Sequence, residues 1–95
     1  MAAYLHAHIQ VNDPIAYEEY RRQVPAMIAA HGGRYLVRGG AAQVLEGATE
    51  VQRQVILEFP TMAALLGFYN SPEYAPLKAL RMGAAEGSIV AVEGV

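Results

Sequence analysis

Apolar and polar residues alternate along the first part of the chain, and the pattern then changes to a longer period. From Leu5 to Val11 every second residue is apolar, and the residues between them include His6 and His8. Such alternation is typical of a β-strand whose two faces meet different surroundings. We therefore predict a strand over residues 4–11, with both histidines on the side opposite the apolar residues.

A helix is predicted directly after this strand. Asp13 can cap its free amide groups, and Pro14 suits the first helical position. The helix is predicted to end at Gly32. Pro25 removes one backbone hydrogen bond and is expected to kink or divide the helix. The buried stripe consists of apolar positions three and four residues apart, namely Tyr17, Tyr20, Val24 and Ile28.

Two further strands are predicted after the helix. Residues 34–38 form a short β-type run that we expect to continue through Leu45, bent at the glycine pair 39–40 where side-chain bulk is absent. Residues 46–48 then make the connection. Residues 51–59 alternate again and predict a third strand. Its two faces carry Arg53, Val55, Leu57 and Phe59 on one side and Gln52, Gln54, Ile56 and Glu58 on the other.

The rest of the chain predicts two helical segments and a last strand. Thr61 can cap the first of these helices, and the Asn-Ser-Pro sequence at 70–72 breaks it and begins the next segment. Gly87 precedes a final strand over residues 88–93. The inward-facing positions of the two helical segments are Leu65, Phe68 and Tyr69, followed by Tyr74, Leu77 and Leu80.

The order strand, helix, strand, strand, helix, strand predicts an α+β ferredoxin-like fold, in which one antiparallel sheet carries helices on one face. In the usual spatial order of this fold, the third strand lies between the first and the second. The face without helices then combines polar and apolar residues, which fits neither a core nor a solvated surface. We expect two chains to pair through this face as a homodimeric α/β barrel. The residues on it are His6, His8, Ile56, Glu58, Leu36 and Arg38.

Composition narrows the class of protein. The chain has 95 residues, of which 54% are hydrophobic and 17% charged, and it contains no cysteine. These values indicate one soluble globular domain over residues 1–95, expected in the cytoplasm. No membrane association is expected, because the apolar runs are shorter than the roughly 20 residues that span a bilayer.

Nucleic-acid binding is disfavoured by charge and by side-chain type. The net charge is −2, and Lys78 is the single lysine, whereas phosphate binding needs a concentrated basic surface. The third strand also carries Val55, Ile56 and Leu57 where an RNA-recognition sheet needs stacking aromatic residues.

The candidate chemistry lies on the face without helices. His8, Glu58 and Arg38 are predicted to lie on adjacent strands with their side chains in one row. A carboxylate there would favour the charged histidine, and arginine would bind an anion. This row suits acid–base work on a small carbonyl compound or acid, with His8 and Glu58 as the candidate catalytic residues. A structural salt-bridge network that sets the dimer register is equally consistent with these residue types.

Other polar residues offer further alternatives. His6 and His8 could hold a metal with Glu58, but no longer metal motif is present, and we expect neither a metal nor a cofactor. Tyr69 is assigned to the ligand pocket because it lies where a predicted helix breaks, whereas the other helical tyrosines suit a core. Arg81 could bind an anion or a nearby carboxylate.

Several short motifs are distributed along the chain, namely His31 to Gly40, Leu45-Glu46-Gly47, Glu58-Phe59-Pro60, Phe68 to Tyr74 and Glu93-Gly94-Val95. With these motifs the chain resembles, over nearly its whole length, the small proteins grouped as domain of unknown function 1330. This resemblance implies a dimeric α/β barrel, within a superfamily that includes small cofactor-free monooxygenases, isomerases and degradation-pathway proteins. The family brings no settled activity, and a shared fold does not transfer a reaction.

Three functions remain open from the sequence. The first is a small-molecule pocket on the sheet face of a dimeric barrel, in a cofactor-free oxygenase or isomerase that acts on a compact carbonyl or aromatic compound. The second is a non-catalytic ligand-binding module with the same pocket, and the third is a structural homodimer. The ligand-binding candidates are His6, His8, Arg38, Glu58 and Tyr69.

Overall fold

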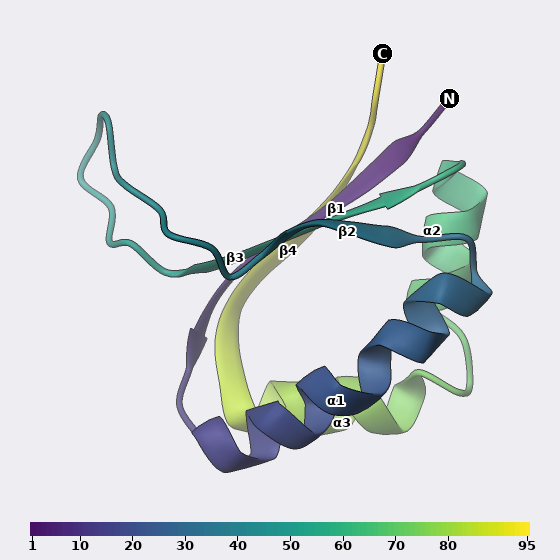
Figure 1. Ribbon diagram of the computed structural model, residues 1–95, viewed down its shortest axis with the longest axis horizontal. Helices are drawn as coiled ribbons and strands as arrows, with labels where there is room; N and C mark the ends of the chain where they lie inside the picture. The colour runs from purple at the N-terminus through teal and green to yellow at the C-terminus, as the bar shows by residue number, and fades with distance from the viewer.

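Four antiparallel strands form one sheet, and three helices cover one of its faces (Figure 1). The computed structural model describes residues 1–95. The strand order is β2-β3-β1-β4, which confirms the predicted ferredoxin-like α+β arrangement. None of the helices is long and apolar enough to cross a membrane. In chain order the elements are β1 (Ala3–Val11), α1 (Pro14–Ala30), β2 (Arg34–Arg38), β3 (Arg53–Phe59), α2 (Met62–Tyr69), α3 (Ala75–Ala84) and β4 (Ala85–Glu93).

The two ends of α1 follow the predicted signals. The side chain of Asp13 accepts a hydrogen bond from the Ala16 amide at 3.1 Å, and Pro14 occupies the first turn. The helix ends before Gly32, whose φ of 79° lies in the left-handed region that glycine adopts without strain. Local sequence therefore fixes where this helix begins and ends.

The expectation that Pro25 divides α1 is wrong, because the helix runs without a break from Pro14 to Ala30. A proline at position 25 cannot donate to the carbonyl four residues earlier, which belongs to Arg21. That carbonyl instead accepts a hydrogen bond of 2.8 Å from Nη2 of Arg38, a residue of β2. A side chain from the sheet thus satisfies the group that proline leaves free.

The second strand is shorter than expected. It ends at Arg38, and residues 39–52 form an irregular loop that extends beyond the sheet at the left of Figure 1, so the predicted continuation through Leu45 is wrong. Gly39 has a φ of 68° and donates its amide to the Gln54 carbonyl at 2.7 Å. The left-handed backbone conformation of Gly39 turns the chain away from β3 directly after β2 ends.

A bulge in β2 changes which side chains face the helices. Tyr35 pairs with Leu57 and Arg38 pairs with Val55, so three residues on β3 oppose four on β2, with Leu36 as the extra one. One extra residue in a strand moves every side chain after it to the opposite face of the sheet. Arg38 therefore lies on the helix-covered face and not on the open face where the sequence placed it.

The last strand begins three residues earlier than expected, at Ala85, directly after α3. Gly87 lies opposite Ile9 in the ladder with β1. A Cβ atom at Gly87 would collide with the backbone of His8 and Ile9, so this position needs glycine for the strands to approach. The glycine thus lies within the strand and allows it to continue.

The core lies between the helices and the inner face of the sheet. Phe59, Phe68 and Leu65 are its largest fully buried side chains. The rings of Phe59 and Phe68 stack with centroids 5.5 Å apart, which joins β3 to α2. Apolar residues of α1 and β1 complete the cluster, namely Tyr17, Val24 and Ile28 with Leu5, Ala7 and Ile9.

Candidate binding sites on the two faces of the sheet

The open face of the sheet, which we call the outer face, carries a polar row at one end. Glu58 on β3 lies directly opposite Tyr4 on β1 and Arg34 on β2. The Tyr4 hydroxyl donates to Glu58 Oε2 at 3.1 Å, and Arg34 Nε donates to Oε1 at 2.7 Å. The hydrogen bond from Arg34, followed by that from Tyr4, holds the pKa of Glu58 below its usual value. Glu58 is therefore already engaged by partners of its own subunit.

The predicted contact between His8 and Glu58 is wrong. His8 pairs with Gln54, four residues from Glu58 on β3, which places the two side chains about 13 Å apart along the strand. The Nε2 atom of His8 is buried without a hydrogen-bond partner. Arg38 is absent from this row because of the bulge. The ligand-binding and catalytic roles of these residues stay predictions.

His6 lies nearer to His8 than Glu58 does. The two imidazole rings are stacked with centroids 6.4 Å apart, and His6 Nε2 is 2.6 Å from Gln54 Oε1. No group of three His, Asp or Glu side chains is arranged to hold a metal ion. The outer face therefore carries two histidines. Nε2 of His6 contacts Gln54, whereas Nε2 of His8 is buried without a hydrogen-bond partner.

Apolar side chains fill much of the remaining outer face. Ile56 lies opposite Val37 on one side and His6 on the other, and Val90 follows His6 on β4. Val90 is 57% exposed and Val92 is 52% exposed. Such a row of apolar residues, uncovered by any helix, is typical of a surface that another protein chain covers.

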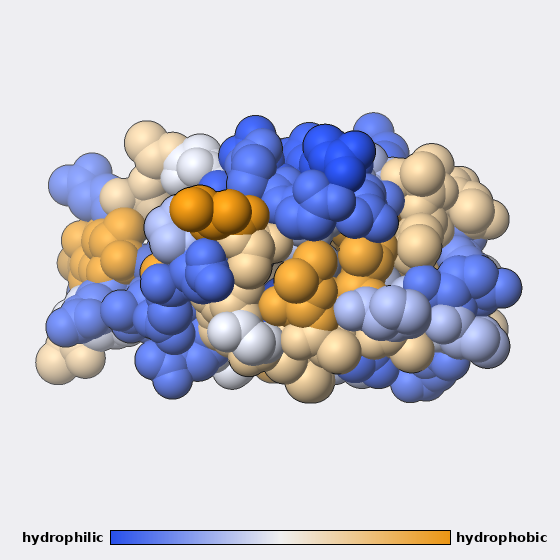
Figure 2. Space-filling model, turned by 90° about the horizontal axis from the view of Figure 1, so that it is seen from below, coloured by the Kyte–Doolittle hydropathy of each residue, from blue (hydrophilic) through white to orange (hydrophobic).

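The opposite side of the molecule differs from this face. Figure 2 views the protein from the side of α1 and α3 and shows hydrophilic residues over much of the surface, with separate hydrophobic patches between them. Ion pairs of α1 contribute to this polar surface, including Arg22 with Glu19. These helices present their polar sides to solvent, as expected for helices whose other side covers a core.

A cavity of about 40 Å³, which we call the inner cavity, lies between the helices and the inner face of the sheet. Eighteen side chains line it, and fourteen of these are hydrophobic. The other four are all arginines from both sides of the cavity: Arg21 on α1, Arg38 and Arg53 on the sheet and Arg81 on α3. No carboxylate belongs to the lining. The cavity is thus apolar with exclusively positive charges.

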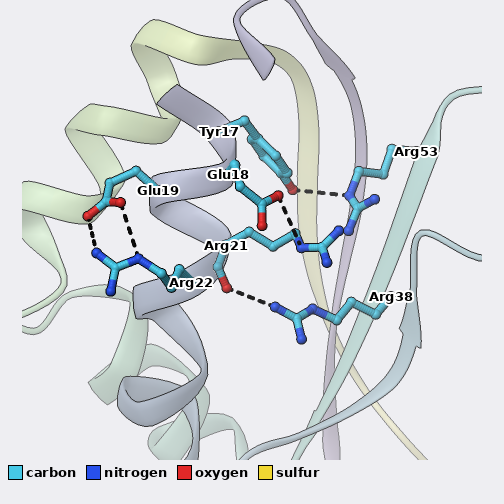
Figure 3. A network of polar contacts seen from close by, with 7 residues as sticks. All are labelled: Tyr17, Glu18, Glu19, Arg21, Arg22, Arg38 and Arg53. Atoms are coloured by element: carbon cyan, nitrogen blue, oxygen red, sulfur yellow. Dashed lines mark hydrogen bonds and ion pairs between the residues drawn. The ribbon is translucent and has the colours of Figure 1, made fainter. Parts of the chain in front are cut away.

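Three of these arginines meet at the gap between α1 and the sheet (Figure 3). Arg53 Nε donates to the Tyr17 hydroxyl at 3.3 Å, and Arg38 donates to the Arg21 carbonyl. The side chain of Arg21 lies 3.7 Å from the Glu18 carboxylate, which is exposed and outside the cavity. Helix α1 therefore anchors both sheet arginines while their remaining donors stay available.

Arg81 differs from the other three because it is buried, with 8% of its surface exposed. Its Nε and Nη2 atoms have no hydrogen-bond partner, and none of the ion pairs of the structure includes it. Tyr20 and Tyr74 lie beside it and share a hydrogen bond of 2.8 Å between their hydroxyls. Burial, helped by Tyr74, raises the pKa of Tyr20 far above its usual value, so this phenol keeps its proton.

The structure thus divides the five predicted ligand-binding residues between two faces. Arg38 and Tyr69 line the inner cavity, whereas His6, His8 and Glu58 lie on the outer face. The alternation of β3 contained a signal for one further lining residue. It places the charged Arg53 on the same side as the core residues Leu57 and Phe59, which is unusual unless the charge has a role.

These observations define the class of the protein first. A four-stranded antiparallel sheet with helices on one face and the order β2-β3-β1-β4 makes this an α+β ferredoxin-like protein. The family follows from the sequence comparison. The model of the family described as domain of unknown function (DUF1330) matches residues 2–95, and the chain belongs to this family. None of the curated proteins matches the chain in sequence.

Several solved structures share this fold. A protein of unknown function from Rhodopseudomonas palustris, RPA0582, is 19% identical with a TM-score of 0.81, covering 99% of this chain and 82% of that chain. SnoaB, a cofactor-independent oxygenase from Streptomyces nogalater, is 11% identical with a TM-score of 0.69, covering 99% and 93%. A dimeric ferredoxin-like protein of unknown function from Thermobifida fusca is 16% identical with a TM-score of 0.61, covering 97% and 88%.

Proposed function

We propose that this protein binds a small organic molecule in the inner cavity and that two copies associate through the outer face. The observation that carries the first part is a cavity with apolar walls and a few convergent polar groups inside the core, the usual composition of a small-molecule site. One ordered water needs about 10–15 Å³ of such space, so 40 Å³ suits a compact group.

The chemistry of the lining favours binding over acid–base catalysis. Arginine guanidinium groups donate hydrogen bonds and stay protonated at neutral pH, and the raised pKa of Tyr20 keeps its phenol protonated too. Such a site can hold a ligand and stabilise negative charge on it. It has no group suited to removing a proton.

A cofactor-free oxygenase or isomerase acting on a compact carbonyl or aromatic compound is the second candidate function. The same arginines would stabilise an enolate or phenolate formed from a substrate that is already acidic. The fold shared with SnoaB is compatible with this reaction class. His8 and Glu58, the predicted catalytic residues, belong to the outer face, and a catalytic role for them requires a pocket formed with the second subunit.

The homodimer is supported by the residues of the outer face. A second copy would cover the exposed valines and place His6, His8 and Glu58 inside the interface. A buried histidine nitrogen without a partner is costly, and a polar group of the second copy would offset this cost at Nε2 of His8. Solved relatives of this fold that are described as dimeric agree with this assembly.

Ligand binding can be tested by titrating the isotope-labelled protein with acetate and, separately, with acetamide while recording amide NMR spectra. We expect at least one of them to shift the signals of β1 and α1 residues that line the inner cavity. Ala7→Leu fills the cavity from β1 and should abolish the shifts, whereas Ala26→Leu, on the exposed side of α1, should leave them unchanged. If Ala7→Leu does not fold, Ile89→Phe fills the cavity from β4. Shifts with neither compound would disprove the site.

Oxygenase activity and binding alone can be separated with an oxygen electrode. The probe is glycolaldehyde, a carbonyl compound of four non-hydrogen atoms whose enediol reacts with oxygen. Uptake of oxygen above the spontaneous rate, lost in Ala7→Leu, would establish catalysis in the inner cavity. Binding without uptake would establish the non-catalytic ligand-binding protein that we favour.

The role of His8 has its own test. His8→Ala should give a folded protein, because the side chain lies on the outer face and contributes no core contact. A dimer that no longer binds its ligand would support a binding or catalytic role, whereas dissociation into monomers would support a structural role in the interface.

A further inference from the structure

We infer that the ligand of the inner cavity is a carboxylate with a compact apolar body, held at its carboxylate end by Arg81. This inference deepens the function proposed above and rests on it. It comes from three properties of the cavity: the sign of its charges, the unpaired edge of one guanidinium group and the type of surface around it.

The charges of the lining all have one sign. Arg21, Arg38, Arg53 and Arg81 supply four positive charges, and no lining residue supplies a negative one. Arg21 and Arg38 are exposed to solvent, and Arg21 pairs with Glu18, whereas Arg53 is half-buried and Arg81 is buried. Charges in apolar surroundings are screened less than charges in water, so Arg53 and Arg81 make the cavity favourable for an anion.

The second property is the unpaired guanidinium edge of Arg81. A buried charge is costly unless it is paired and hydrogen-bonded, and Arg81 is buried with two of its three nitrogens unpaired. It also lies outside every ion pair of the chain. A folded protein retains such a residue at the expense of stability, which is typical of a group reserved for a ligand.

The free edge of Arg81 has the geometry of a carboxylate site. Its unpaired atoms, Nε and Nη2, form one side of the planar guanidinium group and can donate two parallel hydrogen bonds. Arg22 uses the same two atoms on the protein surface, where Nε and Nη2 bind the two carboxylate oxygens of Glu19. The same edge on Arg81, a residue that lines the inner cavity, therefore matches the two oxygens of a ligand carboxylate.

The neighbours of Arg81 determine the rest of the ligand. In the hydroxyl pair of Tyr20 and Tyr74, one hydroxyl donates to the other, which leaves one proton to donate to an anion. The ring centroids of Phe68 and Tyr74 lie 4.5 Å apart, and both rings line the inner cavity. A small apolar group such as a methyl beside the carboxylate fits this surface, because the cavity of about 40 Å³ holds only a few non-hydrogen atoms.

The test compares acetate with acetamide, which have four non-hydrogen atoms each, share a shape and differ in charge at pH 7. We expect the intact protein to bind acetate at least tenfold more tightly than acetamide. Arg81→Met should weaken acetate binding at least tenfold and change acetamide binding by less than threefold. Arg22→Met, which removes a surface arginine outside the cavity, should change neither. Affinities come from calorimetric titration, and NMR shifts establish that the cavity is the site.

Each outcome has a distinct meaning. Equal affinities for acetate and acetamide in the cavity would overturn the carboxylate inference and leave the proposed function standing. Binding of neither would overturn both. If Arg81→Met does not fold, Arg81→Lys keeps the charge and removes the two-point edge, and it should still lower acetate affinity severalfold. Unchanged acetate affinity in Arg81→Lys and Arg81→Met would show that Arg81 does not hold the carboxylate.

Discussion

Arg38 supplies the hydrogen bond that Pro25 removes from the middle of α1. Proline has no amide hydrogen, so the carbonyl of Arg21 lacks its helical donor, and Nη2 of Arg38 donates to it at 2.8 Å. The contact joins β2 to α1 at the inner cavity. One residue pair thus keeps the helix continuous and holds an arginine at the candidate site.

This relationship predicts that Arg38→Ala is less harmful when Pro25 is also replaced. Arg38→Ala should lower the free energy of unfolding by about 1 kcal/mol, because the Arg21 carbonyl loses its donor. In the Pro25→Ala background the new amide of residue 25 can bond to that carbonyl, so the cost should fall below about 0.5 kcal/mol. Urea unfolding of the four proteins measures this coupling. Equal costs in both backgrounds would contradict the relationship.

Close packing predicts different effects for two glycines near β2. A Cβ at Gly33 would lie 2.6 Å from the Phe59 ring and 2.8 Å from Ile28, both in the core, so Gly33→Ala should cost about 1–3 kcal/mol. A Cβ at Gly40 would meet no atom within 4 Å, and Gly40→Ala should stay within about 0.5 kcal/mol of the native protein. Thermal unfolding monitored by circular dichroism compares them. A Gly33→Ala protein as stable as the control would show that the core has room there.

The polar row on the outer face predicts a pH-dependent contribution to stability. The pKa of Glu58 is lower in the folded chain than the value of 4.5 expected when unfolded, so the folded state binds fewer protons in that range. Its contribution is therefore fully present above that value and is lost as the pH falls through the folded-state pKa. The native protein should be more stable than Glu58→Gln at pH 7, and the difference should shrink toward pH 3.

The measurement for Glu58 is urea unfolding at a series of pH values. Glu73→Gln serves as the control, because Glu73 is exposed and lies outside all ion pairs of the structure. A stability difference between Glu58→Gln and the native protein that stays constant from pH 7 to pH 3 would show that the carboxylate makes no net stabilising contact.

The proposed dimer predicts that a charge at Val90 separates the subunits. Val90 is 57% exposed on the outer face of the edge strand β4, and Val90→Lys would bury two unpaired charges in the interface. Dissociation should be favoured at least about a hundredfold. Met82→Lys is the control, since Met82 is 61% exposed on α3, away from this face. Sedimentation at equal concentrations distinguishes monomer from dimer, and a dimeric Val90→Lys protein would place the interface elsewhere.

Much of the fold could be predicted because its signals are local. The Asp13 cap, the stop at Gly32 and the cap at Thr61 each depend on a few neighbouring residues, and the structure confirms all three. The strand order also followed from the sequence of elements, because few arrangements of short connections are possible for this order. These features require no knowledge of distant contacts.

The candidate site was predicted less well, because its geometry depends on contacts between distant residues. Alternation placed His8, Glu58 and Arg38 in one row, but a single bulge near Leu36 moved Arg38 to the other face. The strand register placed Glu58 beside Tyr4 and Arg34 instead of His8. No local pattern reports either event.

The sequence by itself therefore determined the elements, their order and the apolar side of each, since periodicity and caps act within one segment. Only the tertiary structure decided that Arg38 completes α1, that Arg81 is buried with two nitrogens unpaired and that four arginines line one cavity. The physical reason is that burial and pairing of a charge depend on what the rest of the chain brings next to it.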